Sequence, residues 1–356
     1  MMRKRKGIFQ GILAIGFLAI VSGCGSAPSA KQKPGLLAFY YPWYGTPYFS
    51  GQWRHWNEAG HNPDVINSLG FRDIGTTDYP YPDVYDSNDT MRIAWQLDLA
   101  RRAGIDGFIV SWWGINSFED NALKKVLAVD GETQAPLKIA LYYEIVPGQN
   151  IADTISDITY INSNYFGLKN YLKYQGKPVL FVYGRAIFPS QWCTGDCPPG
   201  TPAVIDWSPV IKAFPNVIFV GDAMAYFMTD YSVPLLRNMG FQGIHIYNPV
   251  LDIKLGSDMS AAYGKFTGLA KKDGLLSALT VIPGYNDTNI GRTITSVVNR
   301  DNGKLYTMLA NDALKTSPAP DWILITTFNE WHEGSEIEPS YQYGDQYIDL
   351  TKTLFQ

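Results

Sequence analysis

The 356-residue chain carries little net charge, few histidines and no signature of several common enzyme classes. Its 29 Lys and Arg nearly balance its 33 Asp and Glu, so the net charge of −4 gives no electrostatic basis for binding nucleic acid. The four histidines, His55, His61, His245 and His332, are scattered without ligand spacing, which argues against a metal site. No G-x-S-x-G elbow is present, which argues against a serine hydrolase of that type. We expect no metal and no organic cofactor.

Long apolar runs are also scarce, and the longest one lies at the N-terminus. A basic start is followed by an apolar stretch from about Ile8 to Val21, which is shorter than the ~20 residues that span a bilayer. The ending "VSGC" resembles a bacterial lipobox. We therefore predict a signal peptide over 1–23, lipidation of Cys24 and a flexible tether over 24–34. A plain signal peptide with an incidental cysteine is the alternative. The prediction implies a lipid-anchored protein of the bacterial cell envelope, at the outer membrane or cell surface.

Only three cysteines occur in the chain, and two of them lie close together in "WCTGDCPPG". In an oxidising compartment, Cys193 and Cys197 are expected to form a disulfide that pins a loop. A zinc site is the weaker interpretation, because no second pair of cysteines exists and no histidine is nearby in the sequence.

Aromatic residues, by contrast, are abundant. They make up 14% of the chain, with 10 Trp and 23 Tyr. Their rings combine an apolar face with a polar tip, which suits a concave site that stacks on sugar or base rings. An aromatic core is the alternative, and composition alone does not decide between the two.

Eight apolar, β-branched or aromatic runs alternate with helix-like segments. The predicted strands are 35–45, 104–114, 137–145, 177–184, 216–223, 241–249, 277–285 and 321–331. Near-continuous apolar strands that alternate with helices are typical of a parallel sheet covered on both faces. The pattern predicts an α/β fold, a (β/α)₈ TIM barrel formed by residues 35–356 as a single domain with long βα loops. An open doubly wound sheet is the alternative, but no glycine-rich phosphate turn follows the first strand.

The ends of these predicted strands carry side chains that can do chemistry. They are Tyr41, Trp43, Trp112, Trp113, Tyr143, Glu144, Asp222, His245, Tyr247, Tyr285 and Glu330. In a barrel all strand ends meet on one face, where active sites are built. The sequence therefore predicts one site at that face.

The segment "FNEWHEGSEIEPS", residues 328–340, is the strongest candidate for the chemistry of this site. In an extended strand Glu330 and Glu333 would point to opposite sides, so they share a pocket only if the chain turns after Trp331. Gly334 permits such a turn. Two neighbouring carboxyl groups, one ionised and one protonated, are what the cleavage of a glycosidic bond requires. A solvated surface turn is the alternative interpretation.

Three segments resemble signature motifs of glycoside hydrolase family 99, the endo-α-1,2-mannosidases and mannanases. They are "FYYPWYGTP" at 39–47, "RHWN" at 54–57 and "NEWHEGSEIEPS" at 329–340. The resemblance implies a (β/α)₈ barrel and a retaining reaction. It implies that Glu330 takes a proton from the sugar 2-hydroxyl, giving a 1,2-anhydro sugar, and that Glu333 protonates the departing oxygen and later activates water.

The resemblance also implies a set of substrate-binding residues. In "WW", Trp112 and Trp113 occupy the position of a tryptophan that helps to select the outer sugar, and Glu144 and Tyr247 match positions that hydrogen-bond the sugar. The remaining candidates are Tyr41, Trp43, His55, Tyr285 and Arg292. The chain departs from the family where Ser335 and Glu336 replace threonine and glutamine, and an extra acid near Glu333 would alter the local field.

These observations lead to one main hypothesis and two alternatives. We expect a retaining endo-acting hydrolase of internal α-1,2-mannosidic linkages in α-mannan or mannose-rich glycans. The first alternative is a glycan-binding lipoprotein that has lost catalysis, and the intact Glu330 and Glu333 argue against it. The second is a barrel hydrolase for another α-linked polysaccharide, such as an α-glucan.

Overall fold

The computed structural model describes residues 33–144, 150–192 and 200–356. The predicted signal peptide, the lipidation of Cys24 and the disulfide between Cys193 and Cys197 fall outside these residues and stay predictions, as does the tether up to residue 32. Within the part that is described, no helix has the length and apolar character needed to cross a bilayer. Residues 34–356 form one compact unit.

Eight parallel strands close into a barrel, which confirms the predicted fold. The strands are β1 (Gly35–Tyr40), β2 (Gly107–Trp112), β3 (Lys138–Tyr143), β5 (Lys177–Val182), β6 (Ile218–Asp222), β7 (Gly243–His245), β8 (Leu276–Val281) and β11 (Trp322–Ile325). Closure is visible in the pairing, because β1 pairs with both β2 and β11, and β3 pairs with β5. Each strand overlaps one of the eight predicted runs.

The strands end several residues earlier than the sequence pattern indicates. The run 35–45 is a strand only to Tyr40, and the run 321–331 only to Ile325. The pairing of β1 with β11 stops at Ala38 and Ile325, so the residues that follow have left the ladder. Tyr41, Trp43 and Glu330 therefore lie in loops at the carboxyl face of the barrel, whereas Trp112, Tyr143, Asp222 and His245 are the last residues of their strands.

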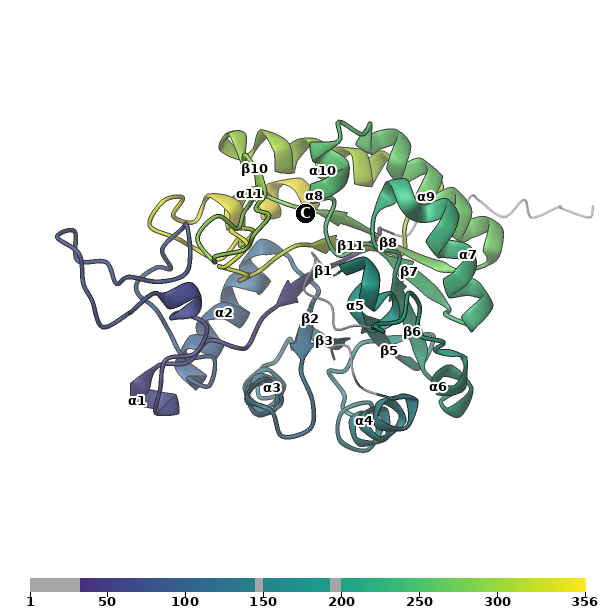
Figure 1. Cartoon of the computed structure of the whole chain (residues 1–356), viewed down its shortest axis with the longest axis horizontal. Helices are drawn as coiled ribbons and strands as arrows, with labels where there is room; N and C mark the ends of the chain where they lie inside the picture. The colour runs from purple at the N-terminus through teal and green to yellow at the C-terminus, as the bar shows by residue number, and fades with distance from the viewer. Residues whose placement is uncertain (1–32, 145–149, 193–199) are drawn as a thin grey trace, which may run out of the picture. The chain divides into compact units, whose positions relative to one another are not determined.

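Helices connect the strands and surround the barrel (Figure 1). They are α2 (Thr90–Ala103), α3 (Phe118–Gly131), α4 (Ile151–Asn164), α5 (Gly184–Ile187), α6 (Ser208–Ala213), α7 (Thr229–Met239), α8 (Val250–Lys254), α9 (Met259–Asp273), α10 (Lys304–Lys315) and α11 (Gln346–Phe355). Helix α2 shows how sequence sets these bounds. The Asp89 side chain accepts a hydrogen bond from the Met91 N–H at the N-cap, and Gly104 ends the helix in the left-handed conformation.

Alternation along each strand separates two cores. In β1, Leu36, Ala38 and Tyr40 pack against the helices, whereas Leu37 and Phe39 fill the barrel interior. In the other strands that supply both cores, alternate residues likewise face the helices and the barrel interior. This alternation decides whether the side chain that follows each strand points toward the barrel mouth.

A long segment, residues 41–89, follows β1 and builds a wall beside the barrel mouth. It contains α1 (Pro47–Ser50) and packs on its own small aromatic core, in which Tyr44, Trp56 and Tyr85 contact Trp331 of the last loop. The remaining short elements are β4 (Lys173–Tyr174), β9 (Tyr285–Asn286), β10 (Val297–Val298), and single 3₁₀ turns at Glu58–Gly60, Pro189–Trp192, Tyr226–Met228 and Asp301–Gly303.

Candidate active site

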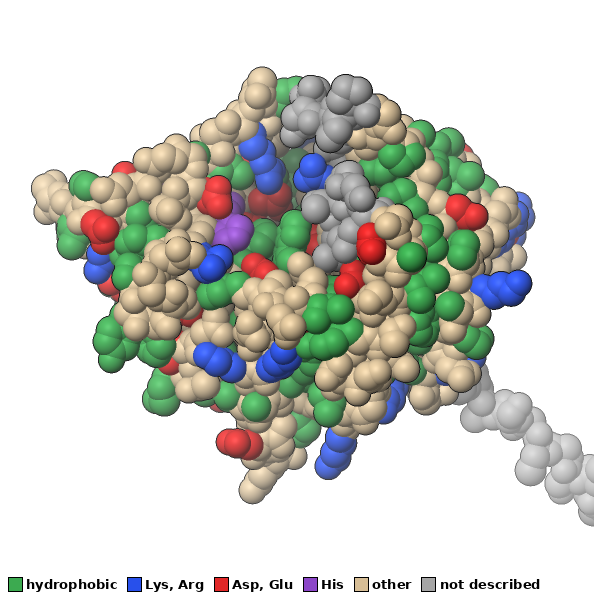
Figure 2. Space-filling model, turned by 60° about the horizontal axis from the view of Figure 1, so that its bottom comes forward, with side chains coloured by type: hydrophobic (Ala, Val, Ile, Leu, Met, Phe, Trp, Pro, Cys, Tyr) green, Lys and Arg blue, Asp and Glu red, His purple; other side chains and the backbone are tan. Residues whose placement is uncertain are grey.

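A pocket of about 160 Å³ lies at the carboxyl face of the barrel. It is lined by Tyr41, Trp43, Trp113, Glu144, Tyr183, Arg185, Tyr247, Arg292, Glu330, His332 and Glu333. These residues follow seven different strands of the barrel, so the pocket forms only when the barrel closes. Figure 2 shows acidic, basic and histidine side chains gathered around one hollow of the surface.

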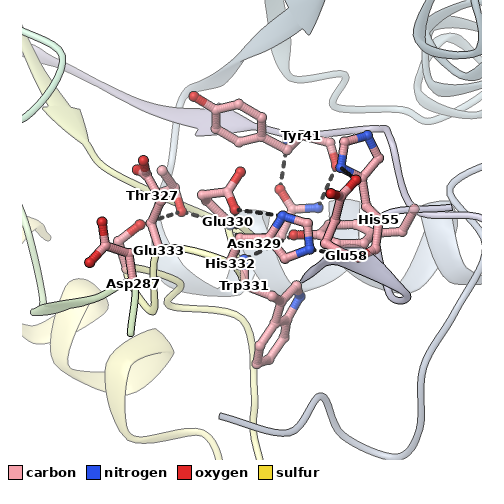
Figure 3. Close-up of polar contacts among 12 residues, drawn as sticks. Tyr41, His55, Glu58, Asp287, Thr327, Asn329, Glu330, Trp331, His332 and Glu333 are labelled. Carbon is pink, nitrogen blue, oxygen red and sulfur yellow. Dashed lines mark hydrogen bonds and ion pairs between the residues drawn. The ribbon is translucent and has the colours of Figure 1, made fainter. Parts of the chain in front are cut away.

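The loop after β11 brings Glu330 and Glu333 into this pocket by the turn that the sequence predicted. The Gly334 N–H donates to the Trp331 carbonyl at 3.2 Å, and Gly334 has a φ of +54°. That left-handed conformation favours glycine, and here it reverses the chain directly after Glu333. Trp331 lies between the two glutamates in sequence but packs into the aromatic core of the 41–89 segment (Figure 3).

Glu330 is almost completely buried, with 1% of its surface exposed. Its Oε1 accepts a hydrogen bond from the His332 N–H at 2.9 Å, and its Oε2 has no hydrogen-bond partner among the residues that the structure describes. Burial, and then the charge of Glu333, hold the pKa of Glu330 well above its usual value. Glu330 therefore favours its protonated form.

Glu333 has the opposite surroundings. Its Oε1 accepts hydrogen bonds from the Tyr285 hydroxyl at 3.1 Å and from Arg292 Nη2 at 3.2 Å, and its Oε2 accepts one from the Tyr247 hydroxyl at 3.1 Å. Three donors, one of them a cation, thus hold the Glu333 carboxyl group in place beside Glu330.

A third carboxyl group, Glu144, lies across the pocket. It accepts a hydrogen bond from the Ser111 hydroxyl at 3.0 Å, and the Trp113 indole N–H donates to the same Ser111 oxygen at 2.9 Å. Burial raises the pKa of Glu144 to about 8, and the charge of Glu333 adds to this effect. At neutral pH Glu144 is therefore mostly protonated and can donate a hydrogen bond to a ligand.

Aromatic rings and neutral imidazoles form another wall of the pocket. Trp43 stacks on the His55 imidazole with ring centres 4.4 Å apart, and its centre lies 6.2 Å from that of Trp113. Burial lowers the pKa of His55 to about 3 and that of His332 to about 4. His332 Nε2 also lies 2.8 Å from the His55 carbonyl oxygen. Both imidazoles are neutral at neutral pH, so this wall suits an uncharged ligand.

The structure brings most of the predicted site residues together. Those that line the pocket are Tyr41, Trp43, Trp113, Glu144, Tyr247, Arg292, Glu330 and Glu333. His55 and Tyr285 do not line the pocket but contact residues that do: His55 stacks on Trp43, and Tyr285 donates a hydrogen bond to Glu333.

Trp112 is placed elsewhere, which corrects the prediction that it contacts substrate. It is fully buried in the layer between barrel and helices, and its indole N–H donates to Asp120 Oδ1 at 2.8 Å. Strand parity is the reason, because Phe108, Val110 and Trp112 all face the helices. Of the two adjacent tryptophans, Trp113 faces the pocket.

Sequence reasoning missed three lining residues, namely Tyr183, Arg185 and His332. Tyr183 follows β5, so the strand-end argument applied to that run would have found it. His332 lies within the last motif but was weighed only as a metal ligand. Arg185 belongs to the short helix α5, and its position carries no local signal.

The described residues hold no cluster of three His, Cys, Asp or Glu side chains that could bind a metal ion. His55 and His61 have separate partners: His55 stacks on Trp43, whereas His61 Nδ1 lies 2.5 Å from Asp73 Oδ1.

Comparison with known proteins agrees with this geometry. The model of glycosyl hydrolase family 99 matches residues 33–351. The mouse glycoprotein endo-α-1,2-mannosidase is 29% identical over 324 residues, which cover 85% of this chain and 67% of the mouse protein. The rat protein of the same name is 28% identical over 336 residues, covering 88% and 70%.

The fold also matches solved structures. The GH99 endo-α-mannosidase from Bacteroides thetaiotaomicron, in complex with BIS-TRIS-propane, superimposes with a TM-score of 0.70 at 24% identity. The match covers 90% of this chain and 96% of that one. At this identity the likeness concerns the fold alone.

Proposed function

Since this chain belongs to glycosyl hydrolase family 99, we propose that it cleaves internal α-1,2-mannosidic linkages in α-mannan or mannose-rich glycans and retains the anomeric configuration. The relatives named endo-α-1,2-mannosidases support this choice of linkage.

One observation carries the proposal: two carboxyl groups with different surroundings share a single pocket. Burial favours a proton on Glu330, whereas Glu333 accepts hydrogen bonds from three donors, one of them a cation. Such a pair can both take and give a proton, and the cleavage of a glycosidic bond needs both.

In the proposed first step, Glu330 takes the proton of the sugar 2-hydroxyl while that oxygen attacks the anomeric carbon. The bond to the departing sugar breaks, and Glu333 gives a proton to its oxygen. In the second step water attacks the anomeric carbon, the bond from that carbon to O2 breaks, Glu333 takes the water proton, and Glu330 returns its proton to O2. A raised pKa supports Glu330 as the base, because a carboxylate of higher pKa binds a proton more strongly.

The pair must redistribute its single proton when the sugar enters. The sugar 2-hydroxyl would donate to Glu330 Oε2, the oxygen that has no partner in the described structure. That hydrogen bond favours the ionised form of Glu330. The proton is then available to Glu333, beside the departing oxygen.

Other lining residues would hold the sugar. The protonated carboxyl of Glu144 and the Tyr247 hydroxyl supply hydrogen bonds, and the rings of Trp43 and Trp113 supply apolar faces for sugar C–H groups. Tyr41, His55, Tyr285 and Arg292 complete the proposed binding set.

The test is product analysis with purified protein on α-mannan and on defined α-manno- and α-gluco-oligosaccharides. We expect reducing ends from internal α-1,2-manno linkages, with the α-anomer formed first by NMR. Glu330→Gln and Glu333→Gln should each lower kcat by at least about 10³-fold while remaining folded. Cleavage of α-gluco-oligosaccharides instead would refute the assigned linkage, and no cleavage by the wild type would refute the hydrolase on these substrates.

We also propose that Cys24 carries a lipid anchor in the bacterial cell envelope. Cys24→Ala should move the protein from the membrane fraction to the soluble fraction. An unchanged distribution would contradict the anchor.

A further inference from the structure

A second cleft lies on the outer side of the 41–89 segment, between this segment and the start of α2. Its volume is about 490 Å³, larger than that of the catalytic pocket, and the two share no lining residue. The residues that line it come from α1, from the stretch 81–89 and from α2. The proposed reaction uses none of them.

The cleft presents aromatic rings to solvent. Tyr48 is 89% exposed, and its ring centre lies 4.9 Å from that of Phe49 in an edge-on arrangement. On the other side of the cleft Tyr81 is half-exposed. Large apolar groups gathered at one exposed place usually mark a binding surface, since isolated ones are common but clusters are not.

Carboxylates stand beside these rings, held in place by backbone donors. Asp86 accepts hydrogen bonds from the N–H groups of Thr46 and Asn88, each at 2.8 Å. Asp83 accepts one from the Val84 N–H at 2.7 Å. The Tyr79 hydroxyl also donates to Asp83 Oδ1 at 2.6 Å, and Asp86 is buried. An ionised carboxylate has about four acceptor sites, so the exposed Asp83 retains sites for donors from a ligand.

Arg92, a cation that lines the cleft, already has partners. The Arg92 guanidinium lies 4.0 Å from the ring centre of Tyr85 and 4.2 Å from that of Trp95, and its Nη2 pairs with buried Glu338 at 3.0 Å. Asp83 in turn has a cation beside it, since its Oδ2 lies 3.8 Å from Arg72 Nε. With these charges paired, the cleft suits a neutral ligand that offers both apolar faces and hydroxyl donors.

The cleft is close to the catalytic pocket along the chain. One segment supplies Trp43 to the pocket and Tyr48 to the cleft, and five residues of extended chain span at most about 17 Å. A single polymeric ligand can therefore engage both places.

We propose that this cleft is a second glycan-binding site that holds a distant stretch of the same neutral mannose-rich chain that the catalytic pocket cuts. The inference rests on the proposed function. Pyranose rings place C–H faces on Tyr48, Phe49 and Tyr81, and their hydroxyls donate to Asp83. Binding at two places raises the affinity for long chains and leaves that for short ones unchanged.

The experiment compares the double variant Tyr48→Ala/Phe49→Ala with the wild type on polymeric α-mannan and on a short α-1,2-manno-oligosaccharide. Both side chains are exposed, so we expect the thermal unfolding temperature to remain unchanged. Tyr231→Ala, which removes a half-exposed tyrosine on α7, is the matched control. We expect the KM of the double variant for the polymer to rise about 5- to 10-fold, with kcat, the KM for the oligosaccharide and the control unchanged.

If the double variant has the KM of the wild type for the polymer, the proposed glycan-binding site is refuted. An equal rise in KM for both substrates also refutes it, because it would mean an effect on the catalytic pocket. A wild type that cuts neither substrate overturns the proposed function instead. In that case affinity electrophoresis in gels containing α-mannan decides: retardation that the double variant loses supports the cleft, and the absence of retardation, or retardation that the double variant keeps, overturns it.

Discussion

The contact between Arg292 and Glu333 offers a direct test of the proton assignment. Arg292 Nη2 lies 3.2 Å from Glu333 Oε1, and its Nη1 lies 2.9 Å from Asp287 Oδ2. A neighbouring cation favours the ionised form of a carboxylate. The Arg292 charge lowers the pKa of Glu330, the other member of the pair. Arg292→Gln should therefore keep the proton of the pair bound to higher pH, and the charge left on Asp287 acts in the same direction.

The size of the effect follows from the distance. Two unit charges 3.2 Å apart interact by about 1.3 kcal/mol at the dielectric constant of water and by about 5 kcal/mol at an effective value of 20. The Arg292 side chain is 45% exposed, so solvent screening moves the interaction toward the lower value. About 1.4 kcal/mol corresponds to about one pH unit.

The assay is the pH profile of kcat/KM on an α-1,2-manno-oligosaccharide. Its alkaline limb reports the loss of the proton that the pair must donate. We expect Arg292→Gln to move this limb upward by about one pH unit, whatever it does to KM. Arg237→Gln, which removes a similarly exposed arginine paired with Asp273, serves as the control and should not move it. An alkaline limb that stays in place or moves to lower pH would show that the Arg292 charge does not act on the proton of the Glu330–Glu333 pair.

Three further changes probe the frame around the site. Glu338→Leu should destabilise the protein by about 3–5 kcal/mol in chemical denaturation, because it leaves the buried Arg92 charge unpaired, and a loss below 1 kcal/mol would contradict the ion pair. Trp112→Phe should lower the unfolding temperature without changing KM, whereas Trp113→Ala should raise KM about tenfold; the reverse pattern in kinetics would refute the assigned orientations. Gly334→Ala should cost about 1–2 kcal/mol and reduce kcat, since its φ is +54° and a backbone oxygen would lie 3.0 Å from the new Cβ; an unchanged kcat would mean that the turn tolerates a side chain.

The fold could be predicted because parallel strands buried on both faces are continuously apolar. The runs "GLLAFY" and "GFIVSW" stand out from their surroundings and match β1 and β2. The turn that brings Glu330 and Glu333 together was also predictable, since it needs a glycine and Gly334 is present.

The same property explains why the two tryptophans could not be separated. When both faces of a strand are buried, hydrophobic alternation disappears, and the sequence does not reveal which of Trp112 and Trp113 faces the barrel interior. The structure shows that Phe108 and Val110 pack on the helices, so Trp112 also faces the helices and Trp113 faces the pocket.

Long-range partners lay beyond sequence reasoning altogether. Glu338 pairs with Arg92, and Glu336 Oε1 lies 2.5 Å from Arg300 Nη2. Both pairs join residues that are distant in the chain, and no local pattern encodes them. They anchor the loop on either side, so the extra acid at Glu336 is paired with a cation outside the pocket lining.

The contact between the two ends of the barrel has a consequence for biogenesis. Asn329, beside the catalytic pair, accepts a hydrogen bond from the Tyr41 N–H at 2.7 Å and donates one to its carbonyl oxygen at 3.0 Å. The loop after the first strand therefore holds the two glutamates in place only once the last strand and its loop have been added. A nascent chain still attached to the ribosome is therefore catalytically silent, and hydrolysis begins only after synthesis has delivered the C-terminal segment.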